Sequence, residues 1–336
     1  MTDTAGYSSG SVILLDRIRA AFLDRHYSYK TEKAYIRWIT KYVFFHGLRD
    51  PVELGEKEIS AFINHLAVDE NHSPSTQNQA LCALIFLYRH VLERKVTGIG
   101  RFFRADRPGR LPVVFSRGEV RAVLAQLEGV HWIMAVLLYG AGLRLRECLQ
   151  LRVRDVDFDG GRIAVRDVWS GKGRVVPLPR AVREPLKAHL ERVRRIHERD
   201  LREGFGSVYL PDTVKRKHPD SPREWEWQYV FPARWISTDP RSGVQRRHHV
   251  YETVLQKAVK KAVRRAGIGR PAGCHSLRHS FAAHLLEDGC DVLIVQALLG
   301  TGDGKTALFL GLGSGQSCSR VWNKGLPKVT SPADGL

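Results

Sequence analysis

Apolar residues recur at helical spacing through the first part of the chain, without the strict alternation that marks strands. The clearest stripe precedes a stop signal at Gly47 and contains Tyr35, Trp38, Ile39, Tyr42 and Val43. Residues 59–66 and 81–88 repeat the pattern, and the last stripe follows Ser73 and Pro74, a favourable helix start. The pattern predicts only helices over residues 11–95, with the aromatic side chains in their core.

The helical periodicity stops over residues 96–112, where Gly, Pro and Arg accumulate. This composition is typical of a linker. Because a chain of 336 residues is long enough for two domains, we predict a helical domain over residues 1–105. A second domain is predicted over residues 106–336.

The second domain opens with a capping-box spacing at Ser116 and Glu119, and its next helix is expected to end near Tyr139. The period then changes between residues 151 and 178, where short apolar runs around Val153, 163–165 and 175–178 alternate with Gly-rich turns. These runs predict a small antiparallel sheet, with a hairpin tip at 171–173. The predicted fold class is therefore multidomain, α and α/β, with a helical first domain and a mixed, mainly helical second domain.

Charge narrows the choice of partner. The chain has 53 Lys and Arg residues against 35 Asp and Glu, a formal net charge of +18. Such an excess indicates a polyanionic partner, most often nucleic acid. No charged leader precedes an apolar run at the N-terminus, and no apolar stretch reaches membrane-spanning length. We expect a soluble cytoplasmic protein with no membrane partner.

Candidate chemistry lies at four basic residues. His275 and Arg278 are three positions apart in a predicted helix, so their side chains share one face. Arg144 follows the Gly-rich turn 140–142, and Lys172 lies on the predicted hairpin tip. Two guanidinium groups can bind the nonbridging oxygens of a phosphodiester, and a lysine can protonate a departing alkoxide. This set therefore predicts chemistry at a phosphodiester.

Two other motifs are excluded by their spacing. Residues 300–306 look like a nucleotide-binding loop, but that motif requires glycine at position 299, where leucine stands. Several possible metal ligands fit no common zinc spacing: Cys274, His275, His279, His284 and Cys290. No acidic cluster for a divalent ion accompanies the basic residues either. We therefore expect neither a metal nor a nucleotide cofactor.

Three motifs together resemble the tyrosine recombinases, also called phage-type integrases: GAGLRLRE around Arg144, SGKGR around Lys172 and HSLRHSFA from His275. Residues 210–232 and 237–263 are similar to the integron integrases, including the insertion of that branch at about 205–249. The resemblance covers roughly residues 12–300 and returns near the C-terminus. It implies a helical SAM-like core-binding domain that clamps DNA, followed by a catalytic domain. It also implies site-specific recombination by a DNA-bound homo-tetramer through a phosphotyrosyl intermediate, without a cofactor.

The resemblance also implies residue roles. Arg144 and Arg278 would bind the scissile phosphate, His275 would assist them, and Lys172 would protonate the leaving 5′-oxygen. Integron integrases act on folded single-stranded DNA hairpins as well as double-stranded sites, and they recognise bases pushed out of the stem. The positions that match their base-contacting residues are Trp227, Pro240, His248 and His249. Stacking on such rings reads the shape of the DNA more than its sequence.

The chain departs from the family pattern after Gly300. Thr301 occupies the position of a family histidine, and Leu310 occupies that of the nucleophilic tyrosine. Residues 308–320 do not follow the family pattern, and a disrupted gene segment, two compensating frameshifts and a sequence error all remain open. We therefore expect a recombinase that is defective in cleavage. The alternatives are a non-catalytic DNA-binding protein that occupies recombination sites and, more remotely, a metal-dependent nuclease, which the missing carboxylate cluster disfavours.

Overall fold

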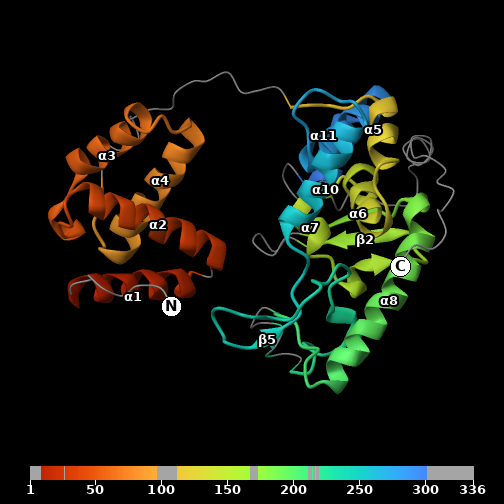
Figure 1. Cartoon of the computed structure of the whole chain (residues 1–336), viewed down its shortest axis with the longest axis horizontal. Coiled ribbons are helices and arrows are strands. Elements are labelled where there is room, and N and C mark those ends of the chain that lie inside the picture. The colour runs from red at the N-terminus through yellow and green to blue at the C-terminus, as the bar shows by residue number, and fades with distance from the viewer. Residues whose placement is uncertain are drawn as a thin grey trace. The chain divides into compact units, whose positions relative to one another are not determined.

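The computed structural model describes residues 9–25, 27–96, 112–166, 173–210, 214, 216 and 219–300 (Figure 1). The chain divides into two compact units, Met1–Gly109 and Arg110–Leu336. The predicted domain boundary after residue 105 and most of the predicted linker fall in 97–111, outside the described residues. Each unit is described below by itself.

The first unit is helical wherever it is described in regular structure. Its elements are α1 (Ser9–Asp24), α2 (Tyr29–Phe45), a 3₁₀ turn (Pro51–Glu53), α3 (Glu56–Val68), α4 (Pro74–Phe86) and a π-helical turn (Leu87–Val91). Serine side chains begin two of the helices: Ser28 Oγ accepts from the Thr31 amide at 3.1 Å, and Ser73 Oγ accepts from the Thr76 amide at 3.3 Å. The prediction of helices over this part of the chain is confirmed.

Aromatic side chains fill the core of the first unit. Phe22, Tyr42, Phe62 and Tyr88 are fully buried. The Tyr88 hydroxyl donates to the carbonyl oxygen of Pro51 at 3.0 Å and lies 3.0 Å from the Tyr42 hydroxyl, so both buried phenols have a partner. The aromatic stripes that predicted these helices are therefore core, as expected.

The second unit surrounds a small sheet with helices. They are α5 (Arg117–Leu124), α6 (Gly129–Gly140), α7 (Leu145–Leu149), α8 (Arg183–Arg202), α10 (Glu252–Arg265), α11 (Cys274–Glu287) and α12 (Val292–Leu299). The predicted capping box opens α5, because Ser116 and Glu119 each bond the other's backbone amide. Helix α6 is apolar on every side and is buried over 132–140, packed against α10 and α11. None of the described helices combines the length and apolar character needed to cross a membrane.

The predicted antiparallel sheet is confirmed, in the order β1 (Val156–Asp157), β2 (Arg162–Val165) and β3 (Arg174–Pro177). Ile163 pairs with Val156 on one side and with Val176 on the other. Val153, expected in the first strand, lies instead in a 3₁₀ turn (Val153–Asp155), because the Asp155 carboxylate accepts from the Arg152 amide at 2.9 Å and caps that turn. The mainly helical fold class with a small antiparallel sheet is confirmed.

A second, two-stranded ladder joins β4 (Ser237–Thr238) and β5 (Gln245–Arg246). Its pairing continues beyond the strands, since the Ala233 amide donates to the His248 carbonyl at 2.6 Å and the Val250 amide donates to the Phe231 carbonyl at 2.9 Å. Residues 231–250 therefore fold back on themselves as one hairpin, which is called the arm below. The arm extends away from the helices of its own unit (Figure 1).

Candidate active site

Arg144 is placed by the turn before it. Gly142 has a φ of +61°, and a Cβ at this position would lie 2.5 Å from the Phe281 ring, so glycine is required there. Arg144 is the N-cap residue of α7, and its backbone amide donates to Glu147 Oε2 at 2.7 Å. Its guanidinium Nη1 donates to Glu147 Oε1 at 2.7 Å. The Glu147 carboxylate in the first turn of α7 thus holds both the backbone amide and the guanidinium of Arg144.

Arg278 approaches the same place from α11. It is 8% exposed, and its guanidinium donates to the carbonyl of Gly142 and, at 2.6 Å, to that of Leu299. Its Nη1 also lies 3.6 Å from Glu147 Oε2. Arg144 and Arg278, which are far apart in sequence, therefore converge on one carboxylate, Glu147. Burial and the neighbouring Arg144 charge lower the pKa of Arg278 to about 10, which leaves it protonated at neutral pH.

Glu147 and Arg174 complete this group, and the sequence analysis assigned neither of them a role. Arg174, on β3, donates to the Glu147 carboxylate twice, from Nη1 at 2.8 Å and from Nη2 at 2.7 Å. Two features of the sequence could have identified them. Glu147 lies three residues after Arg144, and Arg174 comes just after Lys172 and Gly173. Arg144, Arg174, Arg278 and Glu147 are called the arginine cluster below. Its three cations and one anion leave an excess of positive charge.

The carboxyl end of α12 faces the arginine cluster. Three consecutive backbone carbonyls each accept from a different arginine: Leu298 from Arg174 at 2.7 Å, Leu299 from Arg278 at 2.6 Å, and Gly300 from Arg144 at 3.2 Å. The negative end of a helix dipole favours such cations. Gly300, the last residue that the structure describes, therefore lies beside the cluster.

Of the two other predicted catalytic residues, only His275 lies among the described residues. His275 is exposed in the first turn of α11, the helix that carries Arg278, and its ring centroid is 6.5 Å from that of His279. Lys172, Thr301 and Leu310 lie outside the described residues. The structure therefore brings Arg144 and Arg278 together and places His275 on the same helix as Arg278. An exposed imidazole on the helix that supplies one guanidinium of the cluster suits the binding of a phosphate.

Glu147 is expected to make the free energy of unfolding depend on pH. Burial raises its pKa, but the hydrogen bonds and charges of Arg174 and Arg144 outweigh burial and lower the pKa from 4.5 to about 2. A lowered pKa stabilises the folded state above pH 4.5 and ceases to do so as the pH falls through 2. We therefore expect Glu147→Gln to remove about 3 kcal/mol of unfolding free energy at neutral pH.

Chemical denaturation at neutral pH and at about pH 3 tests this expectation. In Glu147→Gln, the unfolding free energy should change less between the two conditions than in the parent chain. Glu184→Gln is the control, because its carboxylate, on α8, is 80% exposed and pairs only with Lys187 among the described ion pairs. Equal pH dependence in the parent and Glu147→Gln would contradict the assignment.

A second group of rings surrounds Tyr229, a buried residue just before the arm. The Arg152 guanidinium lies 3.6 Å above the Tyr229 ring. The His248 ring stacks on Tyr229 with centroids 5.6 Å apart, and the His249 ring meets it edge-on at 5.3 Å. The two histidine rings are 4.3 Å apart. Two of the predicted base-contacting residues therefore form one layered surface with Tyr229.

His249 is held in one orientation as a neutral ring. Its Nδ1–H donates to the Val250 carbonyl at 2.8 Å, and the Gln150 side-chain amide lies 3.4 Å from Nε2. Burial, together with the nearby His248 and arginine groups, lowers the pKa of His249 to about 4. Burial and Arg152 also lower the pKa of His248, although this residue is exposed overall. These rings therefore suit contact with an uncharged base better than contact with a phosphate.

The other two predicted base-contacting residues, Trp227 and Pro240, lie in different elements: Trp227 ends a 3₁₀ turn (Trp225–Trp227), and Pro240 lies between β4 and β5. Trp227 is half-buried beside Tyr229, and the Arg154 guanidinium lies 4.1 Å from its ring centroid. Pro240 is exposed in that turn of the arm. Trp235, which the sequence analysis did not single out, is 71% exposed on the arm. No group of three or more His, Cys, Asp or Glu residues that could hold a metal ion occurs among the described residues.

Comparison with known proteins identifies the family. The model of the phage integrase N-terminal SAM-like domain matches residues 14–98, and that of the phage integrase family matches residues 117–307. An integrase/recombinase from Escherichia coli is 43% identical over 326 residues, which are 97% of this chain and 94% of its own length.

Two solved structures share the fold. A Tn1549 transposon integrase in complex with transposon right end DNA matches with a TM-score of 0.57 at 16% identity, over 91% of this chain and 97% of its own. XerH recombinase bound to difH substrate matches with a TM-score of 0.56 at 16% identity, over 96% and 88% of the two chains. The SAM-like first domain expected from the resemblance is confirmed. Together, the two family matches and the full-length relative show that the chain belongs to the phage integrase family of tyrosine recombinases.

Proposed function

We propose that the chain is a site-specific DNA recombinase of the integron integrase type whose present sequence cannot cleave DNA. The observation that carries the proposal is the arginine cluster, in which Arg144 and Arg278 converge beside the end of α12. The net charge of +18 supports a DNA partner. Relatives of the same fold, XerH recombinase and the Tn1549 integrase, have been solved in complex with DNA.

In the proposed reaction, the arginine cluster binds the scissile phosphate. Arg144 and Arg278 would donate to its nonbridging oxygens, on which negative charge grows as an entering oxygen attacks phosphorus. His275 would add a donor from the exposed turn of α11, and Lys172 would protonate the leaving 5′-oxygen. In a competent member a tyrosine oxygen would form the new bond to phosphorus, and this covalent bond would conserve the phosphodiester energy without a cofactor.

The defect is proposed from the chain itself. Thr301 and Leu310 stand where the resemblance places a histidine and the tyrosine, and the match to the family model ends at residue 307, before Leu310. Leucine has no nucleophilic atom. Assembly as a homo-tetramer on DNA, in the cytoplasm, belongs to the same proposal.

The integron assignment rests on the arm and the rings at its base. The arm lies within the proposed insertion at about 205–249, and Trp227, His248 and His249 group around Tyr229. Neutral, oriented rings beside arginines can stack on an unpaired base. Such stacking accepts any of the bases, because every base has an aromatic face. Pro240, at the tip of the arm, would contact a base farther out. We propose that these four residues recognise bases outside the stem of a folded DNA hairpin.

Binding assays test the DNA proposal. We expect the full chain to prefer a folded hairpin with unpaired bases over the fully paired duplex of the same sequence. Both affinities should fall steeply between about 50 and 200 mM salt, because neutralised phosphates release counterions. Gel-shift competition measures the preference, and equal affinity for the two DNAs would rule out the integron assignment.

Two changes should remove the hairpin preference while leaving most nonspecific binding: Trp227→Ala and the double change His248→Ala/His249→Ala. The loss per base should be about 1–3 kcal/mol if stacking is lost. Trp225→Ala is the matched control, since Trp225 lies in the same 3₁₀ turn but its ring is near His197, at 6.0 Å. A similar loss in the control would indicate a general effect on folding.

The alternative function is a non-catalytic DNA-binding protein that occupies recombination sites. The observation that favours it is the absence of tyrosine after Tyr251 in the sequence. Both functions predict the same binding and no cleavage by the present chain, so they are separated by whether a chain with a restored nucleophile segment cleaves DNA. A metal-dependent nuclease is a third, remoter possibility, and insensitivity of any cleavage to EDTA would exclude it.

A further inference from the structure

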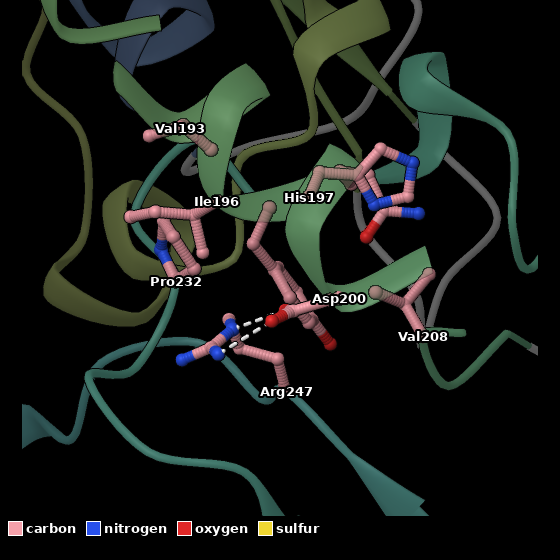
Figure 2. Close-up of a pocket in the computed structure, with 9 residues that line it drawn as sticks. Val193, Ile196, His197, Asp200, Val208, Pro232 and Arg247 are labelled. Carbon is pink, nitrogen blue, oxygen red and sulfur yellow. Dashed lines mark hydrogen bonds and ion pairs between the residues drawn. The ribbon is translucent and has the colours of Figure 1, made fainter. Parts of the chain in front are cut away.

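A buried ion pair joins the arm to the end of α8. Arg247 follows β5 and is immediately before His248, and Asp200 lies in the last turn of α8. The guanidinium donates to both carboxylate oxygens, from Nε at 2.5 Å and from Nη2 at 2.8 Å. The side chains are 11% and 2% exposed. Figure 2 shows the pair side by side in a small pocket between α8 and the arm.

Arg247 also holds the opposite side of the arm. Its Nη1 donates to the carbonyls of Ala233, at 2.9 Å, and Arg234, at 2.6 Å. One guanidinium therefore ties the outgoing and the returning backbone of the arm to a single carboxylate on a long helix. Bidentate pairs of this kind fix orientation as well as distance.

The arm needs such an anchor because its own ladder is short. β4 and β5 contribute two residues each, and an isolated two-stranded hairpin is marginally stable in water. The pocket around the pair is otherwise lined partly by apolar side chains, including Val193, Val208 and Pro232 (Figure 2). Removal of one partner there would leave the other charge buried and unpaired.

We propose that Asp200 and Arg247 are positioning residues that fix the arm, and with it His248 and His249, where an unpaired base can stack. This inference rests on the proposed recognition of unpaired bases. The backbone link is direct, because the His248 carbonyl accepts from Ala233 within the segment that Arg247 holds. Once the pair is broken, the rings at Tyr229 lose a fixed backbone while the arginine cluster is unaffected.

Two measurements on the full chain test this proposal. The first is the ratio of hairpin to duplex affinity by gel shift, and the second is hydrogen exchange of peptides from the arm and from α8. The variants are Asp200→Asn and Arg247→Lys. The control is Glu198→Gln, which removes one carboxylate from the same helix, where it pairs with Arg194 at 3.4 Å and is 55% exposed.

In Asp200→Asn, the hairpin-to-duplex ratio should fall about tenfold, and the duplex affinity should change by less than about twofold. Amides in 231–250 should exchange faster, and those of α8 should keep their rates. Arg247→Lys should give the same pattern more weakly, because lysine is a point charge that cannot bridge a carboxylate and two carbonyls. Glu198→Gln should match the parent chain in both measurements.

The outcomes separate this inference from the function on which it rests. If the parent chain shows no hairpin preference, the proposed base recognition fails, and exchange of the arm alone decides whether the pair positions it. Unchanged arm exchange in Asp200→Asn and Arg247→Lys would overturn the inference, whatever the DNA result. A retained hairpin preference with a mobile arm would overturn it as well. If Asp200→Asn does not fold, Arg247→Lys, which keeps the buried charge, decides.

Discussion

Incubated with a nicked suicide substrate, from which the cut fragment diffuses away, the full chain is expected to yield no protein-linked DNA. The phosphate can be bound by the arginine cluster, but the position proposed for the nucleophile holds Leu310, which has no atom able to attack phosphorus. Denaturing gel electrophoresis of labelled substrate measures the covalent complex. Trapping by the unmodified chain would contradict the proposed defect, and peptide mapping would then identify the nucleophile in use.

A repaired chain is the matching positive test. Residues 301–320 would be replaced by a family-like segment that carries Thr301→His and Leu310→Tyr. We expect this chimera to form the covalent complex, because Arg144 and Arg278 already converge beside Gly300. Leu310→Tyr alone should restore less of the covalent complex than the chimera does. Thr301 lacks an imidazole, and the Gly-rich stretch that follows is a poor helix former. If the chimera folds and binds DNA but does not cleave it, the catalytic roles proposed for four residues would be contradicted: Arg144, Lys172, His275 and Arg278.

The second large effect is expected from Arg278 in that chimera. Arg278→Ala should lower the cleavage rate by about 100- to 1000-fold, the usual cost of one donor to transition-state charge. Binding to the site should weaken only modestly, because many other backbone contacts share the phosphate charge. Single-turnover cleavage and gel shifts measure the two effects separately.

Two further variants control for folding. Arg278→Ala also leaves the carbonyls of Gly142 and Leu299 without this donor, so thermal unfolding must be compared. Arg278→Lys keeps the charge but not the bidentate geometry, and it should also lower cleavage strongly. Arg146→Ala is the matched control from α7, because Arg146 is 52% exposed and lies 3.6 Å from Glu252 rather than in the arginine cluster. Near-normal cleavage by Arg278→Ala would remove Arg278 from the active site.

Patterns that depend on neighbours in sequence predicted the structure well. The stripes around Trp38 and Tyr42 became helices with buried rings, because periodicity records which face meets the core. The turn before Arg144 and the capping box at the start of α5 were also found, since glycine and cap residues act locally. Val153 was misplaced because the capping of a turn by Asp155 outweighed the strand propensity of valine.

Contacts between distant segments were harder to predict. Glu147 has an ordinary helix-capping position in the sequence, and only the fold brings Arg174 and Arg278 to its carboxylate. The same holds for Asp200 and Arg247, whose partners lie on different elements. The uncharged state of His249 depends on burial beside Tyr229 and on three nearby cationic or imidazole groups, which no local pattern records.

The contacts at the end of α12 bear on how this chain can change over evolution. The three arginines bind backbone carbonyls there, so exchange of the Leu298 or Leu299 side chain leaves the acceptors in place. Gly300 is different, because its φ is +64° and a Cβ would lie 3.0 Å from Arg174 Nη1. One residue inserted into or deleted from α12 would turn the carbonyls by about 100° around the helix axis, away from the arginines. We therefore expect descendants of this gene to exchange one apolar residue for another in α12, where Val295 and Leu298 are buried, and to keep its length.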